Sequence, residues 1–521
     1  MSENGDKHPD AIASALVLAS VFVIAICGLV YELIAGTLSS YLLGDSTTQF
    51  SLTIGLFLTS MGVGSFFSRF FLRNLLFWFI AIEIAIGVIG GTSALAGFAA
   101  FAFTRSYIPI LASFVFAVGA LVGLEIPLVI RLLREVKSLR ITVANVFSVD
   151  YAGALFASLV FPFVLLPHLG LVRSALVVGI ANVLVAALLL FNLRSQLKRG
   201  RTTLAIAVLT AFVGLTATAF VAGGLVRGFE NRVYQDDVIY SSTSQYQEII
   251  VTRWHRDVRL YLNGHLQFSS VDEYRYHEAL ALPALAATES RKNVLILGGG
   301  DGLLAHQVLK YKDVETVTIV DLDSVVTDLF TETKMLRELN QDSLHDGRVS
   351  VQNRDAMEFL AESSQTYDVI LIDLPDPSES ALAKLYSEAF YRLCLKHLSA
   401  GGVLATQATS PFRSKEAFWC IETTLAAVRQ GPPSAAQAFY TRPYHAYIPT
   451  FGTWGFVLAS RRAIDPTSLK LKVPTKFLTQ EMLGSLFVFP KDLAKIEVPV
   501  NQLNAPVLSR LYRKGYHKYL D

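Results

Sequence analysis

Long apolar runs fill the first part of the chain and stop near Leu225, and after Arg227 charged, polar and apolar residues alternate as in a globular protein. A helix needs about 20 apolar residues to cross the hydrocarbon core of a bilayer. Seven stretches are long enough: 12–35, 51–68, 75–103, 107–130, 142–166, 170–192 and 203–225. The pattern predicts a multi-span α-helical membrane domain over 1–226, with about seven transmembrane helices, followed by a globular half.

Composition supports this division. Hydrophobic residues make up 52% of the 521 residues and charged residues only 17%, below the roughly 25% that is typical of soluble domains. We therefore expect a multi-pass protein of the cell (inner) membrane, with the lipid bilayer as a partner. The net charge of +2 gives no argument for nucleic acid. The three cysteines, Cys27, Cys394 and Cys420, have no paired or metal-like spacing, so we expect neither a disulfide nor a metal.

A glycine-rich loop is the first motif in the globular half that indicates ligand binding. The apolar run 293–297 predicts a strand, residues 298–302 read Gly-Gly-Gly-Asp-Gly, and a helical pattern starts at Leu303. Glycines at such a turn let a ligand approach the amino terminus of the helix. A second strand, 316–320, ends in Asp321 about 20 residues further on, where a carboxylate accepts both hydroxyls of a ribose. This spacing predicts a nucleoside site.

Carboxylates follow each predicted strand of this half. Strands at 349–353 and 367–372 extend the pattern to a Rossmann-like, doubly wound sheet. Because ligands bind at the carboxyl edge of such a sheet, the following side chains should converge on one crevice: Asp301, Asp321, Asp355, Asp373 and Asp376. Helix capping would explain one of the five, but not all. An acidic crevice beside a nucleoside site attracts cations, so we expect an amine substrate.

Together these motifs resemble the spermidine synthase family. The resemblance rests on Gly298 to Gly302, Asp321 where the family usually has Glu, Asp355-Ala356, and Asp-x-x-Asp-Pro from Asp373 to Pro377. Further motifs fit in the same order: Tyr246 to Ile249, Asp272 to Glu278, Leu385 to Tyr391, and Ile448 to Phe451. They cover nearly all of the globular half. The predicted domains are therefore a small β-rich region at 227–285, the Rossmann-like aminopropyltransferase domain at 286–490 and a C-terminal tail at 491–521.

The resemblance implies transfer of an aminopropyl group from decarboxylated S-adenosylmethionine to putrescine or a related diamine, giving spermidine and methylthioadenosine. The small-molecule partners would be the diamine and the nucleoside sulfonium. Sulfur leaves as a neutral thioether, so no metal is required, and the resemblance implies no tightly bound cofactor. A homodimer is kept open.

The family pattern also implies residue roles. Asp373 would be the general base for the attacking amine. Asp301 and Asp376 would hold amino groups of donor and acceptor, with Tyr276 and His277 lining the same cleft. The methylthioadenosine part would be bound by Gln247, Gly298, Gly300, Asp321, Asp355 and Ala356, with Asp321 at the ribose and Asp355 at the adenine amino group. Without the motif shared with the family, Tyr276 would be interpreted as an aromatic residue of the core and His277 as a structural histidine.

Two departures affect the expected cleft. Residues 378–381, Ser-Glu-Ser-Ala, stand where the family often has Gly-Pro in a loop over the site, and Leu303 follows Gly302 where a second glycine is usual. No motif accounts for the segment from Val498 to Asp521.

Two other functions remain as alternatives. One is a methyltransferase that uses S-adenosylmethionine on a membrane substrate, since the same sheet serves both chemistries. The other is a non-catalytic polyamine transporter or sensor. Asp301 argues against the first, because it suits a donor without a carboxylate, and Asp373 argues against the second.

The predicted membrane half leaves two questions open. Lys and Arg are concentrated in the loops after the second, fourth and sixth spans, which predicts a cytoplasmic amino terminus. Seven crossings would then place the globular half outside, away from a cytoplasmic nucleoside donor. Either one segment does not cross, or an eighth crosses, or the chemistry takes place outside. Intramembrane Glu32 and Glu125 fit a polyamine path or interhelix hydrogen bonds equally, and Glu83 and Asp150 fit the second reading better.

Overall fold

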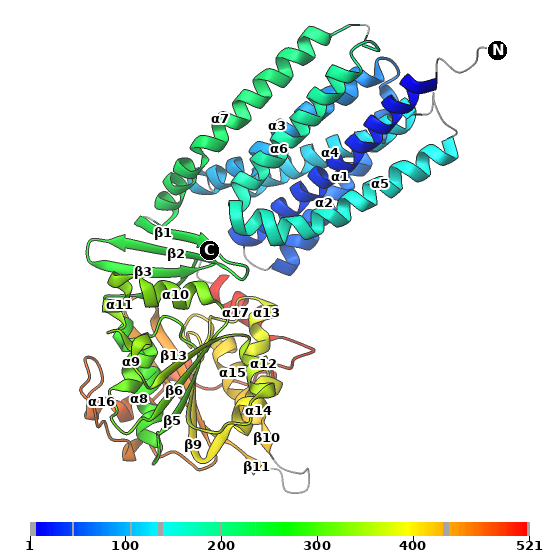
Figure 1. Ribbon diagram of the computed structural model, residues 1–521. Helices are drawn as coiled ribbons and strands as arrows, with labels where there is room; N and C mark the ends of the chain where they lie inside the picture. Colours follow the sequence, from blue (N-terminus) through cyan, green and yellow to red (C-terminus); the bar gives the residue numbers. More distant parts are fainter. Residues whose placement is uncertain are drawn as a thin grey trace, which may run out of the picture. The chain divides into compact units, whose positions relative to one another are not determined.

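The computed structural model describes residues 7–43, 46–104, 107–133, 139–197, 199–234, 236–430 and 437–517. The chain forms two compact units, Met1–Val238 and Ile239–Asp521. In Figure 1 the first is a bundle of long helices, and the second combines helices with two main sheets.

Every apolar stretch predicted in the first unit lies in a helix. The helices are α1 (Lys7–Leu43), α2 (Ser46–Phe67), α3 (Leu75–Phe103), α4 (Tyr107–Leu133), α5 (Leu139–Val160), α6 (Leu166–Asn192) and α7 (Arg201–Tyr234), with short turns η1 (Ser68–Phe70) and η2 (Phe161–Leu165). Within the described residues, six helical segments are long and apolar enough to cross a membrane, since α5, η2 and α6 run on as one segment of 54 residues. Its backbone leaves helical geometry at Gly170, where φ is 69°, so a kink separates two of the predicted stretches.

Small residues allow the helices of the first unit to pack closely. A Cβ at Gly64 on α2 would lie 1.9 Å from the carbonyl oxygen of Ala120 on α4, and one at Gly87 on α3 would lie 2.7 Å from that of Gly179 on α6. Such glycines let helix backbones approach each other, as they do in membrane bundles. Glu83 and Glu125 are buried in this bundle, at 0% and 5% exposure.

A four-stranded sheet in the order β1-β2-β3-β4 comes first in the globular half, with β2 antiparallel to β3 and β3 antiparallel to β4. Its strands are β1 (Asp237–Thr243), β2 (Glu248–Trp254), β3 (Asp257–Leu262) and β4 (His265–Ser269). Ile249 and Val251 on β2 pack with Phe330, so this sheet is attached to the larger one through shared apolar contacts. These four strands lie between residues 237 and 269.

The larger sheet has seven strands in the order β12-β13-β9-β8-β5-β6-β7, and β10 and β11 form a separate two-stranded sheet. The strands are β5 (Asn293–Gly298), β6 (Thr316–Asp321), β7 (Val349–Asn353), β8 (Tyr367–Asp373), β9 (Leu398–Gln407), β10 (Arg429–Gln430), β11 (Gln437–Ala438), β12 (Tyr440–Ile448) and β13 (Gly452–Ser460). The helices are α8 (Glu273–Ala287), α9 (Leu303–Leu309), α10 (Ser324–Glu332), α11 (Lys334–Leu339), α12 (Ala356–Glu362), α13 (Ser380–Ala383), α14 (Glu388–Lys396), α15 (Lys415–Ala427), α16 (Gln480–Ser485) and α17 (Leu508–His517), with turns η3 (Ser343–His345), η4 (Lys384–Tyr386), η5 (Pro466–Ser468) and η6 (Lys491–Leu493).

Strands β5 to β9 are parallel, and β13 runs antiparallel to β9. Alternate residues of one strand serve two separate cores: Ile296 packs on the side of α8 and α9, and Leu295 on the side of α14 and α15. Helices therefore cover both faces, which confirms the predicted Rossmann-like, doubly wound sheet. The strand order reverses between β5 and β8, the place where open parallel sheets bind ligands.

The C-terminal segment is part of the second unit. The indole Nε1 of Trp419 donates to the carbonyl of Leu493 over 3.1 Å, and Asn501 Nδ2 donates to the carbonyl of Ala383 over 2.8 Å. Helix α17 then packs against α15 and α13 (Figure 1). The sequence patterns did not predict this arrangement.

Candidate active site

The glycine loop after β5 lies against the ends of two neighbouring strands. Gly298 has a φ of 83°, and a Cβ there would lie 2.0 Å from the carbonyl oxygen of Asp373. A Cβ at Gly300 would lie 2.7 Å from the carboxyl carbon of Asp321. Because any side chain at these two positions would collide, glycine is required for the loop to meet both aspartates.

Asp321 is held by that loop. Its carboxylate accepts hydrogen bonds from the backbone N–H of Gly300, at 2.9 Å, and from that of Asp323, at 3.0 Å. Burial raises the pKa of Asp321 above the ordinary aspartate value, and the two N–H donors oppose that rise. Each carboxylate oxygen keeps one lone pair, so the side chain can still accept two hydroxyl groups.

Asp373 lies at the carboxyl end of β8, in register with Gly298 of β5. Its Oδ1 accepts a hydrogen bond from the hydroxyl of Tyr276 on α8, with 2.6 Å between the oxygens. Among the described residues, Oδ2 accepts no hydrogen bond. Burial raises the pKa of Asp373, against the opposing influence of His277 and of the Tyr276 hydroxyl. A partly buried carboxylate with one oxygen held by a hydrogen bond and one oxygen available is suited to accepting a proton.

His277 is a buried cation beside these carboxylates. Its Nδ1 lies 2.8 Å from a carboxylate oxygen of Glu273, one helical turn earlier on α8. Burial lowers the pKa of His277, but Glu273, Asp301 and Asp373 outweigh burial and raise it to about 9. The side chain of His277 is therefore an imidazolium at neutral pH, and its positive charge stabilises the ionised form of the neighbouring carboxylates.

Asp301 follows the glycine loop, and its Oδ1 accepts the backbone N–H of Leu303 at 2.9 Å. Burial raises its pKa to about 7; His277 opposes this rise and Asp373 adds to it. Asp376, like Asp301, is partly buried, and its Oδ2 accepts a hydrogen bond from the hydroxyl of Tyr512 at 2.9 Å. Burial raises the pKa of Asp376 to about 6. An ammonium group would offset the cost of ionising either carboxylate.

Two residues predicted to bind the nucleoside, Asp355 and Gln247, are bound to other side chains of the protein. Asp355 caps α12 by accepting the backbone N–H of Met357 at 2.7 Å, and it pairs with Lys384 at 2.9 Å. Although burial raises the pKa of Asp355, Lys384 and the capping N–H groups lower it overall. Gln247 Nε2 donates to Asp323 Oδ2 at 3.0 Å, not to Asp321. The capping alternative thus describes Asp355, whose neighbour Ala356 is the buried first residue of α12.

The structure therefore brings part of the predicted set together. Six side chains meet at the carboxyl edge of the sheet: Tyr276, His277, Asp301, Asp321, Asp373 and Asp376. Asp355 and Gln247 are each bound to a side chain outside this set, Asp355 to Lys384 and Gln247 to Asp323. Among the described residues, no three His, Cys, Asp or Glu side chains group as a metal site. The arrangement can bind a nucleoside and cations, and it can accept a proton at Asp373.

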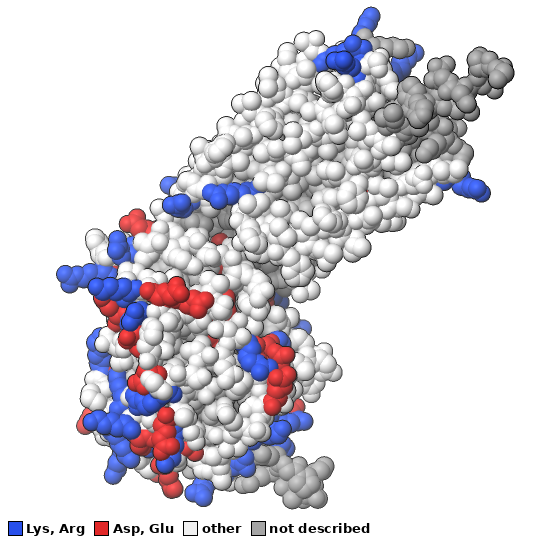
Figure 2. Space-filling view, viewed as in Figure 1, with Lys and Arg blue, Asp and Glu red and all other residues white. Residues whose placement is uncertain are grey.

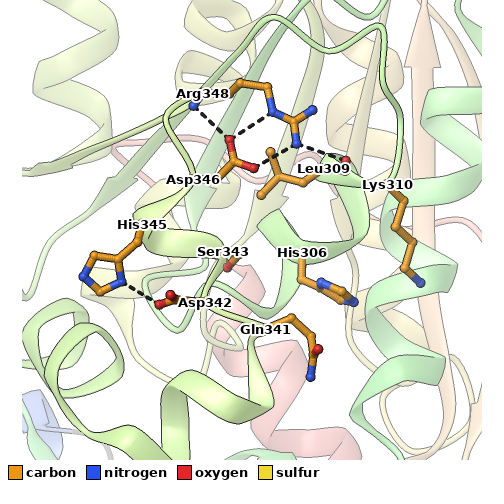
Figure 3. Close-up of a pocket in the computed structure, with 9 residues that line it drawn as sticks. All are labelled: His306, Leu309, Lys310, Gln341, Asp342, Ser343, His345, Asp346 and Arg348. Carbon is orange, nitrogen blue, oxygen red and sulfur yellow. Dashed lines mark hydrogen bonds and ion pairs between the residues drawn. The ribbon is translucent and has the colours of Figure 1, made fainter.

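A separate pocket of about 450 Å³ does not belong to this edge. Lys310 follows α9 and Arg348 precedes β7, so these lining residues lie at the amino edge of the sheet. Figure 3 shows two pairs within this pocket: Arg348 pairs with Asp346 at 2.9 Å, and His345 with Asp342 at 2.6 Å. None of the predicted site residues lines it.

Comparison with known proteins decides the family. The spermine/spermidine synthase domain matches residues 273–468. A polyamine aminopropyltransferase of Leptospira interrogans is 45% identical over 96% of this chain and 99% of its own, and polyamine aminopropyltransferase 1 of Ralstonia nicotianae is 43% identical over 99% and 98%. The chain belongs to the polyamine aminopropyltransferase family. The predicted resemblance is confirmed, and the protein is an enzyme of aminopropyl transfer. A solved spermidine synthase in complex with the transition-state analogue AdoDATO is 28% identical, covers 49% of this chain and 88% of its own, and has a TM-score of 0.44.

Three residues near the site of this aminopropyltransferase were not predicted from the sequence to belong to it. Glu273 pairs with His277 and lies one helical turn before it, a spacing that signals such a pair. Gln407 Nε2 donates to the carbonyl of Leu374 at 2.8 Å. Gln407 ends β9, the strand beside β8, so the same carboxyl-edge rule would have found it. Tyr512 comes from the tail, where no motif gave a signal.

Proposed function

We propose that this aminopropyltransferase uses decarboxylated S-adenosylmethionine as its donor and putrescine as its acceptor, giving spermidine and methylthioadenosine. One observation carries the proposal: Asp373 is partly buried beside the glycine loop, with Oδ1 held by Tyr276 and Oδ2 available to a proton. A base at that position lies between a nucleoside site and carboxylates that suit ammonium groups.

The methylthioadenosine part of the donor would lie along the glycine loop. Gly298 and Gly300 leave room for it, and Asp321 accepts the ribose hydroxyls with its remaining lone pairs. Asp355 would contact the adenine amino group through a lone pair not used by Lys384, beside Ala356. Gln247 would close the site through its bond to Asp323.

The transfer itself needs one base. The nitrogen lone pair of the neutral acceptor attacks the carbon beside the sulfonium, the new C–N bond forms, and the C–S bond breaks with its electron pair going to sulfur. The proton lost by the nitrogen goes to Asp373. Because burial raises the pKa of Asp373, the carboxylate is a stronger base than an exposed aspartate. Holding both substrates in line supplies the rest of the rate increase.

Asp301 and Asp376 would each hold an ammonium group, Asp301 that of the donor and Asp376 the far end of the acceptor. Both are partly buried. His277 and Tyr276 would line the cleft between them. A carboxylate at the donor's amino end favours the decarboxylated molecule, because S-adenosylmethionine would bring a second carboxylate next to Asp301.

The first unit, in this proposal, spans the inner membrane. Its surface carries large exposed apolar side chains, such as Phe220 at 86% and Leu72 at 79% exposure. On the face in Figure 2, charged residues of this unit appear only toward its two ends. Such an apolar band suits lipid better than water. Recovery in the membrane fraction after alkaline carbonate washing is expected; release into the soluble fraction would contradict it.

The donor can be tested directly. The purified protein is incubated with putrescine and either decarboxylated S-adenosylmethionine or S-adenosylmethionine, and products are identified by mass spectrometry. We expect spermidine and methylthioadenosine in equal amounts with the first donor and no methylated product with the second. The proposal would be wrong if the protein transferred a methyl group from S-adenosylmethionine and formed no spermidine from the decarboxylated donor.

A further inference from the structure

The C-terminal helix α17 reaches the acidic crevice. Its Tyr512 hydroxyl donates to Asp376 Oδ2 at 2.9 Å. The domain shared with the spermine and spermidine synthases ends at residue 468, so this contact comes from outside it. Tyr512 is 7% exposed, and the Tyr516 ring packs against it, tilted by 34°, with ring centroids 4.5 Å apart.

Helix α17 is fixed against the chain that precedes α15. A Cβ at Gly515 would lie 2.6 Å from the Cα of Ser414, so only glycine permits this approach. Ser414 Oγ donates to the carbonyl of Tyr512 at 3.3 Å, and Leu508 at the start of the helix is fully buried. The position of the Tyr512 side chain is therefore set by backbone contacts.

The same helix borders the segment that follows Asp376. Arg513 Nη1 lies 3.5 Å from the carbonyl oxygen of Ser378, to which it donates, and α17 packs against α13 (Figure 1). Residues 378–381 are where this chain departs from the family's Gly-Pro. Helix α17 thus contacts both the side chain of Asp376 and the loop after it.

We propose that α17 forms one wall of the acceptor site: Tyr512 is a positioning residue that orients Asp376 toward the distal ammonium group of the diamine, and the Tyr512 ring limits the length of the amine accepted. This inference rests on the proposed acceptor role of Asp376. Specificity for amine length would then be set by a segment outside the shared domain.

The charge state of Asp376 gives this role a signature. The titratable side chains that face Asp376 are Tyr276 from α8, Tyr386 from η4, and Tyr512 and Tyr516 from α17. Burial raises the pKa of all four phenols, so they stay neutral over the range in which Asp376 titrates. The Tyr512 hydrogen bond favours the carboxylate, against burial. Without that bond, Asp376 would hold its proton to higher pH.

The first test is Tyr512→Phe in the full-length enzyme, which keeps the ring and removes the hydroxyl. We expect the KM for putrescine to rise roughly tenfold, while the KM for the donor changes by less than about twofold. The acid limb of kcat/KM for putrescine should move to higher pH. Tyr367→Phe is the matched control: it removes a buried hydroxyl bonded to Gln365 at 2.9 Å, away from the crevice, and should change none of these values.

The second test is Tyr512→Ala with diamines of four, five and six carbons. The smaller side chain should raise the kcat/KM of a longer diamine relative to putrescine by roughly tenfold. An unchanged putrescine KM and acid limb in Tyr512→Phe would overturn the positioning role, and an unchanged length preference in Tyr512→Ala would overturn the limiting role. If the wild-type enzyme transfers aminopropyl groups, either of these results contradicts only the role proposed for α17. If the wild type does not transfer them, both the proposed function and the role of α17 are wrong.

Discussion

Tyr276 donates a 2.6 Å hydrogen bond to Asp373, and this bond ties helix α8 to the carboxyl end of strand β8. The pair lies where the glycine loop meets the sheet, since Asp373 is in register with Gly298. The bond occupies Oδ1, which orients Oδ2 of the proposed base toward the substrate.

Replacing this hydroxyl should therefore change the base without removing it. In Tyr276→Phe, we expect kcat to fall roughly tenfold, because one charge-assisted hydrogen bond to Asp373 is lost. The acid limb of kcat should move to higher pH, since the hydrogen bond lowers the pKa of Asp373. Steady-state kinetics from pH 5 to 9 measure both effects, and an unchanged profile would show that Tyr276 is only a core aromatic.

His277 provides a second test of the site's electrostatics. His277→Asn removes a cation that opposes the burial-raised pKa of Asp301 and Asp373 and leaves Glu273 unpaired. Both changes favour the protonated carboxyl groups, so their pKa values rise and activity is lost at higher pH than in the wild type. The acid limb of kcat/KM reports this shift. A shift toward lower pH would contradict the assignment of a buried imidazolium.

Asp301 should distinguish the donor from its product. In Asp301→Asn, we expect binding of decarboxylated S-adenosylmethionine to weaken roughly tenfold or more, the contribution of a charged hydrogen bond, with methylthioadenosine binding nearly unchanged. The product lacks the amino group that Asp301 would hold. Calorimetry with both ligands measures the difference.

Asp355→Asn is the contrasting variant for that experiment. Asp355 would contact the adenine, which both ligands contain, so their binding should weaken by similar factors. Equal weakening in Asp301→Asn as well would assign Asp301 to the loop and not to the donor.

The globular half should keep its chemistry without the helical unit. Every residue assigned to the site lies in the compact unit Ile239–Asp521. A truncated chain beginning at Asn231 is expected to release methylthioadenosine from donor and putrescine. If this chain is folded and binds methylthioadenosine but does not transfer, while the full-length enzyme does, the helical unit is needed for transfer, and Glu32 and Glu125 become the residues to replace.

The sequence predicted the parts of the fold that follow from local patterns. Strands β5, β6 and β8 are short apolar runs that end in Gly298, Asp321 and Asp373, and the carboxyl-edge rule correctly brought these residues together. Hydrophobic length likewise predicted the long helices. In the sequence, the only sign of the kink at Gly170 was a short gap between two predicted apolar stretches.

The remaining features depend on contacts between distant segments. Tyr512 meets Asp376 from 136 residues away, and no periodicity in the tail signals that contact. The pairing of Gln247 with Asp323 depends in the same way on how the first sheet packs on α10. Asp355 matched the family motif, but whether its carboxylate caps a helix or points at a ligand is decided by the position of Lys384.

The central claim is that Asp373 is the base of aminopropyl transfer. The most direct measurement compares wild-type enzyme and Asp373→Asn for single-turnover methylthioadenosine release with saturating donor and putrescine, alongside methylthioadenosine binding by calorimetry. We predict a rate loss of roughly 100-fold or more, as expected for a lost general base, with methylthioadenosine affinity retained. A rate within about tenfold of the wild type, below the usual contribution of a general base, would contradict the account.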